Sequence, residues 1–110
     1  MDAPLKEKPG TDSTLPEKIT VKQAYPNPFN PSTQLGVELP ESSHVRIEIF
    51  DVMGRRVTTV HDQVLSSGSH SLQWNVGSGL ASGVYIAQYR ITGLASGYPI
   101  VFHQKLNLLK

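Results

Sequence analysis

From residue 19 onward, hydrophobic and polar residues alternate with a period of two. The clearest run is residues 45–49, Val-Arg-Ile-Glu-Ile, where three β-branched residues share one face and two charged residues share the other. Such alternation is typical of a half-buried β-strand, and no window has the period of an amphipathic helix. Similar runs cover residues 19–24, 35–39, 56–60, 70–74, 84–91 and 100–109. The pattern therefore predicts seven strands.

Turn-forming residues separate these runs. Asp51 can accept backbone N–H bonds and Gly54 can adopt a positive φ, which predicts a type I turn with a glycine bulge. Leu80 is the large apolar residue of a glycine-rich loop and is expected to fill one end of the core. Short antiparallel strands at this spacing predict an all-β, immunoglobulin-like antiparallel β-sandwich. The chain has no cysteine, so it lacks the disulfide of antibody domains.

The stretch from Tyr25 to Thr33 reads YPNPFNPST and contains three prolines. Each proline fixes φ and lacks a backbone donor, so this stretch cannot continue a strand ladder. We expect it to cross stiffly from one sheet to the other. Tyr25 and Phe29 are expected to point inward, and Asn27 and Asn30 to satisfy nearby backbone groups.

Residues 1–18 differ from the rest of the chain. Seven of them are charged and three are proline, so they offer too little apolar surface to order themselves. We interpret residues 1–18 as a linker and residues 19–110 as one domain. Because linkers connect folded parts, the sequence also suggests a larger protein with a further domain upstream.

Composition and motifs exclude several functions. With 10 Lys+Arg against 9 Asp+Glu, no basic surplus exists for binding nucleic acid. No apolar run approaches the ~18 residues of a membrane span. The chain has no metalloprotease, nucleotide-binding or nucleophile-elbow motif, and its four histidines are scattered. We therefore expect no catalytic, cofactor-binding or metal site, and no cofactor.

From Tyr25 to Lys110 the sequence resembles the type A C-terminal sorting domain of the type IX secretion system of Bacteroidetes-type bacteria. Five segments carry this resemblance in the family's order. They are the proline-rich stretch 25–33, the strand-turn-strand 45–57, the Gly-x-His-x-x-x-Trp segment 68–75, the GLASGVY element 79–85, and the terminal KLNLLK, 105–110. Leu106 stands where the family often has Met, which is a volume-conserving change.

The resemblance implies a non-enzymatic secretion signal. Such a domain would follow a cargo domain, pass through the periplasm, and be recognised by type IX translocon components that carry the cargo across the outer membrane. A sortase-like peptidase would then remove the sorting domain. The cargo would be attached to the cell surface or released into the extracellular medium. We expect cleavage within the linker, where cutting leaves the sandwich whole, at Gly10, Thr11, Asp12, Ser13, Thr14 or Leu15.

The same resemblance suggests roles for individual residues. Those expected to contact the translocon are Pro26, Asn27, Pro28, Asn30, Pro31, Arg55, Lys105, Leu106 and Lys110. Those expected to maintain the fold are Tyr25, Phe29, Asp51, Gly54, Trp74, Leu80, Gly83 and Tyr85. Alternation in the last strand puts Ile100, Phe102, Leu106 and Leu108 on one face, and the strand could also offer its backbone to a receptor.

Two other functions stay open from the sequence. A carbohydrate-binding or adhesive module would need a row of exposed aromatic side chains, for which Tyr98, Phe50 and Tyr25 are the candidates. A plain spacer domain would use the motif residues for folding alone. It predicts that substituting the terminal lysines leaves secretion intact.

Overall fold

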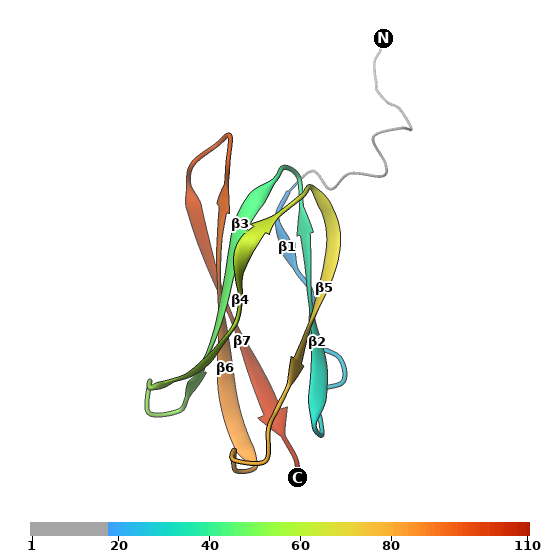
Figure 1. Ribbon diagram of the computed structural model, residues 1–110, viewed down its shortest axis with the longest axis vertical. Helices are drawn as coiled ribbons and strands as arrows, with labels where there is room; N and C mark the ends of the chain where they lie inside the picture. The colour runs from blue at the N-terminus through green and yellow to red at the C-terminus, as the bar shows by residue number, and fades with distance from the viewer. Residues whose placement is uncertain (1–17) are drawn as a thin grey trace.

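Seven β-strands and no helix occur in residues 18–110, the part of the chain that the computed structural model describes. Residues 1–17 of the predicted linker lie outside the described residues, and so does the predicted cleavage region from Gly10 to Leu15. The strands are β1 (Thr20–Val21), β2 (Ser32–Leu39), β3 (Ser43–Asp51), β4 (Arg56–Leu65), β5 (Gly68–Asn75), β6 (Gly83–Gly93) and β7 (Pro99–Leu108) (Figure 1). The predicted number of strands is confirmed.

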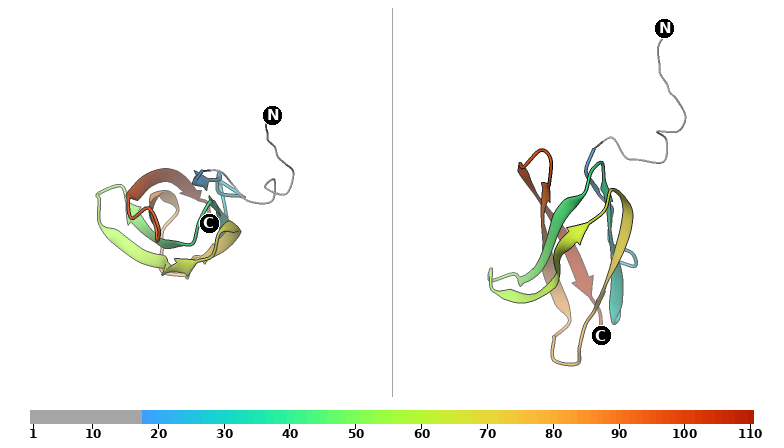
Figure 2. Two further views of the ribbon diagram at one scale, coloured as in Figure 1. Left: turned by 90° about the horizontal axis from the view of Figure 1, so that it is seen from above. Right: turned by 45° about the horizontal axis from the view of Figure 1, so that its top comes forward.

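The strands form two antiparallel sheets that pack as the layers of a sandwich (Figures 1 and 2). One sheet has the order β1-β2-β5 and the other has the order β4-β3-β6-β7. The predicted β-sandwich is therefore confirmed. In constant-type immunoglobulin domains the fourth strand lies in the same sheet as the first two strands. Here β4 lies in the other sheet, next to β3.

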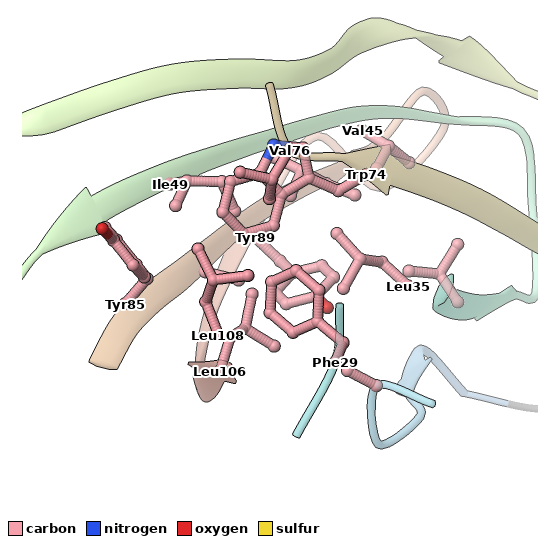
Figure 3. Close-up of a cluster of buried hydrophobic side chains, with 14 of the residues drawn as sticks. Phe29, Leu35, Val45, Ile49, Trp74, Val76, Tyr85, Tyr89, Leu106 and Leu108 are labelled. Atoms are coloured by element: carbon pink, nitrogen blue, oxygen red, sulfur yellow. The ribbon is translucent and has the colours of Figure 1, made fainter. Parts of the chain in front are cut away.

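Alternating residues of both sheets fill the core. Val45, Ile47 and Ile49 of β3 are fully buried, as their spacing predicts. Three aromatic side chains meet in this core (Figure 3). Trp74 lies 5.4 Å from Phe29, and 6.2 Å from Tyr85 in an edge-on arrangement, measured between ring centroids. Such tilted pairs add stability beyond their buried area, and the predicted core positions of these three residues are confirmed.

The proline-rich stretch does not cross between sheets, and that prediction is wrong. It connects β1 to β2, which are neighbours in the same sheet. The chain changes sheet at residues 40–42, 66–67 and 76–82, between β2 and β3, β4 and β5, and β5 and β6. The stretch instead leaves its own sheet, contacts the edge of the other sheet, and returns.

The inward position predicted for Tyr25 is also wrong. Tyr25 is 78% exposed, whereas the neighbouring Ala24 is buried. The backbones of Tyr25 and Gln34 exchange two hydrogen bonds across an antiparallel bridge. Residues directly opposite each other share one face of a sheet, and Gln34 lies on the outer face, so Tyr25 does too.

Candidate functional site

Residues 25–31, here named the proline segment, lie alongside the end of β7. The backbone of Phe29 accepts a hydrogen bond from the Leu109 N–H at 3.0 Å and donates one to the Asn107 carbonyl at 2.9 Å. These two bonds form a parallel bridge between Phe29 and Leu108. The proline segment therefore acts as a short extra strand on the outer edge of β7.

The Asn27 side chain extends this contact. Its Nδ2 donates to the Lys105 carbonyl at 3.0 Å, and its Oδ1 accepts from the Asn107 N–H at 2.9 Å. The prediction that Asn27 satisfies nearby backbone is therefore wrong, since its partners lie 78 and 80 residues away. The local bond in this region comes from the buried Thr33, whose hydroxyl donates to the Pro26 carbonyl at 2.7 Å.

The Phe29 side chain secures the proline segment from beneath. It is 2% exposed and packs against Trp74 in the core, near Leu108 (Figure 3). Pro26, Pro28, Asn30 and Pro31 are exposed. The segment is thus anchored by one aromatic side chain and presents its prolines to solvent.

The loop before β6 holds the end of the chain. The Lys110 N–H donates to Ser82 Oγ at 2.8 Å, and its Nζ donates to the Ser78 carbonyl at 3.0 Å. The Tyr85 hydroxyl of β6 donates to the Ala81 carbonyl of this loop at 2.7 Å, and Leu80 of the loop packs partly buried against the core, as predicted. In Figure 1 this loop and the C-terminus lie at the same end of the sandwich. Gly83 begins β6 directly after the loop.

We name the contact between the proline segment and residues 105–110 the junction. Of the terminal residues predicted to contact the translocon, Lys105 and Lys110 are exposed. Leu106 is completely buried, so its prediction as a surface contact is wrong. Its spacing along β7 places it on the same inner face as Leu108, where the other sheet covers both side chains.

The turn between β3 and β4 has the predicted chemistry. Asp51 Oδ1 accepts the N–H groups of Met53 and Arg55 at 2.9 and 3.0 Å, and Gly54 has a φ of 85°. The Arg55 backbone N–H, followed by smaller contributions that include the Arg55 guanidinium, lowers the pKa of Asp51. Arg55 is exposed, but its Nε donates to Asp51 Oδ2 at 3.1 Å, so part of its guanidinium serves the turn.

Little in the described residues suggests chemistry. In residues 18–110, no three His, Asp or Glu side chains lie together as metal ligands would, and no helix is long and apolar enough to cross a membrane. Burial lowers the pKa of His61, whose Nε2 has no hydrogen-bond partner among these residues. The three aromatics that the sequence offered for a carbohydrate site, Tyr25, Phe50 and Tyr98, come from separate elements: Tyr25 precedes β2, Phe50 lies in β3, and Tyr98 lies in the β6–β7 turn.

Comparison with known families identifies the domain. Residues 23–96, more than half of the chain, match the family described as the secretion system C-terminal sorting domain. The match includes the proline segment, Trp74 and the loop before β6, and it ends before β7. No match to a curated protein was found. The chain therefore belongs to the C-terminal sorting domains, the family of signals for type IX secretion rather than of known enzymes.

Proposed function

We propose that the junction is the part of this sorting domain that the type IX translocon binds. On this proposal, binding directs a cargo domain upstream in the same polypeptide across the outer membrane. The observation that carries the proposal is the pairing of the proline segment with residues 105–110. It joins two sequence motifs from opposite ends of the domain into one surface.

The physical properties of the junction suit a signal that is recognised after folding. The prolines restrict the backbone before any partner arrives, so binding loses little conformational entropy. Phe29 and Asn27 connect the segment to the core and to β7, and Lys105 and Lys110 add positive charge to the exposed surface. Arg55 is a further exposed contact in this proposal.

The route of export is part of the same proposal. The cargo would pass through the periplasm and reach the cell surface or the medium. A sortase-like peptidase would remove the domain within Gly10 to Leu15, before β1 begins. Mass spectrometry of the mature cargo would locate that cut, and a cut inside the sandwich would contradict this step.

An export assay tests the proposed function. The full 110-residue chain is fused to the C-terminus of a periplasmic reporter in a host with a type IX system, and surface and medium fractions are assayed. We expect the fusion to be exported and the unfused reporter to stay in the periplasm. The double variant Lys105→Ala, Lys110→Ala should reduce export. Lys18→Ala is the control, because Lys18 is also exposed but lies outside the junction, and it should leave export unchanged.

Two outcomes would contradict the proposal. Retention of the wild-type fusion in the periplasm would reject the domain as a sufficient signal. Unchanged export of a folded Lys105→Ala, Lys110→Ala variant would favour a plain spacer role for the lysines. Deleting residues 105–110 is not a clean test, because it also removes Leu106 and Leu108 from the core.

A further inference from the structure

β7 is the outer strand of the four-stranded sheet, and residues 18–110 cover only part of its free edge. Backbone groups of Lys105, Asn107 and Leu109 point away from β6, where Asn27 and Phe29 bind them. The N–H and C=O groups of successive residues point to alternate sides of a strand, and β7 pairs with β6 without a register shift. The N–H and C=O groups of Val101 and His103 therefore also point away from β6. Within residues 18–110, their backbone N–H and C=O groups have no partner on this side.

The covered part ends at Gln104. The Gln104 Nε2 donates to the Lys22 carbonyl at 3.0 Å, and its Oε1 accepts from the Ala24 N–H. Before Lys22, β1 has only two residues, and both pair with β2 instead of β7. Residues 99–103 are therefore an edge that no part of residues 18–110 covers, which we name the open edge. In Figures 1 and 2 it belongs to the hairpin of β6 and β7, at the end of the sandwich opposite the C-terminus.

The open edge has few of the features that normally prevent strand pairing. Proteins protect such edges with bulges, charged side chains or prolines. Here the pairing of β6 with β7 contains no bulge, and Pro99 stands only at the start of the strand. Ile100 and Val101 are each 43% exposed, and Tyr98 is 77% exposed. The edge thus combines free backbone groups with apolar side chains on both faces.

The strands β6 and β7 carry only positive charge. No aspartate or glutamate occurs from residue 63 to residue 110. Carboxylates reach them from other elements: Glu48 of β3, across from Gln88, is bound by Arg46 and Arg56, and Glu41 Oε1 accepts from the Ala95 N–H in the β6–β7 hairpin.

Arg90 lies directly across from Val101 on β6, and Lys105 shares the outer face of β7 with Val101 and His103, so Arg90 and Lys105 form the cationic row of this face. A strand added beside β7 would place its own outer side chains beside Val101 and His103, on the same face as this cationic row, whereas its inner side chains would lie beside Ile100 and Phe102.

We propose that the open edge accepts an extended strand of the secretion machinery, with acidic side chains on its outer face and apolar ones on its inner face. This inference rests on the proposed function, and it places a second contact apart from the junction. Val101 and His103 supply two N–H donors and two C=O acceptors for the added strand. A second copy of this chain fits less well, because pairing two β7 edges would bring the two cationic rows together.

Proline substitutions test the backbone contact in the same export assay. Val101→Pro and His103→Pro each remove one outward N–H, which the fold does not use among the described residues. Val101→Ala and His103→Ala keep the N–H and shorten the side chain. We expect the proline variants to lose export by about ten-fold, the effect of one or two lost hydrogen bonds, and the alanine variants to stay close to wild type.

Each result separates this inference from the proposed function. If the wild-type fusion is not exported, the proposed function fails first. If the wild type is exported and folded proline variants are exported equally well, or the alanine variants lose as much export, the open edge is not a strand-pairing site. Folding of each full-length variant is checked by circular dichroism and thermal unfolding.

A second pair of variants covers the case in which proline disturbs the fold. Arg90→Glu places a negative charge beside the open edge, and Lys18→Glu makes the same charge change on an exposed lysine elsewhere. We expect only Arg90→Glu to reduce export, because an acidic strand would be repelled. Equal export of both variants, or a dimer of the isolated chain that Val101→Pro disrupts, would overturn the proposal.

Discussion

The two halves of β7 have the same alternating pattern but different surroundings. In residues 104–108 the inner face is buried by the opposite sheet and the free edge is bound by the proline segment. In residues 99–103 the corresponding inner side chain, Ile100, is 43% exposed and the edge is open. The difference arises from the partner, since β1, which precedes Lys22, pairs with β2 in the other sheet and leaves the edge of residues 99–103 without a partner among the described residues. Alternation therefore sets the face of a residue, whereas coverage by neighbouring elements decides its burial.

The comparison separates stability from recognition. The covered half contributes fully buried side chains, Leu106 and Leu108, and bonded backbone groups. The open half contributes the partly buried Phe102 to the core, and its outward backbone groups at Val101 and His103 have no partner within residues 18–110. We expect substitutions in the covered half to act on the free energy of unfolding, and those in the open half to act on binding.

The largest effect should come from removing the anchor of the covered half. Phe29→Ala deletes a side chain that is 2% exposed and contacts Trp74, so it should lower the free energy of unfolding by about 3–5 kcal/mol. Tyr25→Ala is the matched control, because Tyr25 is 78% exposed and its loss should cost less than about 0.5 kcal/mol. Urea unfolding of the full chain measures both. Similar losses in the free energy of unfolding for the two variants would contradict the anchor role of Phe29.

A second pair of variants compares the halves on one face of β7. Leu106→Ala should lower the free energy of unfolding by about 2–5 kcal/mol, because Leu106 is fully buried and a cavity would remain. Ile100→Ala should lower it by less than about 1 kcal/mol, because Ile100 already contacts solvent. Thermal and urea unfolding would measure these values. A loss at Ile100 as large as that at Leu106 would contradict the division of β7 into two halves.

The smallest effect should come from the side-chain bonds at the covered edge. Asn27→Ala removes two exposed hydrogen bonds to β7 and should lower the free energy of unfolding by about 1–2 kcal/mol. Asn30→Ala is the control, because Asn30 makes no hydrogen bond within residues 18–110. Hydrogen exchange at the Asn107 amide should accelerate in Asn27→Ala alone. In the wild type this amide should exchange more slowly than those of Val101 and His103, and equal rates would remove the distinction between the two edges.

Much of the sandwich is predictable from the sequence because it depends on local rules. The alternation at residues 45–49 identifies a buried face, and the Asp51–Gly54 pattern identifies a turn whose bonds lie within four residues. Trp74 is predictable as core because it is the one tryptophan on an alternating strand. Each of these predictions needs only the residue and its neighbours.

The geometry of the candidate site was less predictable because it depends on distant pairing. Nothing near Asn27 in the sequence indicates that its amide binds backbone groups 78 and 80 residues away. The proline segment has no periodicity that could reveal which sheet edge it contacts, and the face of Tyr25 depends on pairing with Gln34. The open edge has no local signal either, because it exists only where no other element of the described residues pairs with β7. The absence of aspartate and glutamate from residue 63 to residue 110 is the sequence feature that indicates positive charge on β6 and β7.

The bonds between Asn27 and Asn107 also have a consequence for biosynthesis. The two residues are 80 positions apart, so at roughly 5–20 residues per second the ribosome adds the second one about 4–16 s after the first. During that interval Phe29 and the inner faces of the early strands have no partner in β7, and they are candidates for chaperone binding. An assembled contact between these two asparagines therefore reports that translation and folding have both proceeded through the seventh strand.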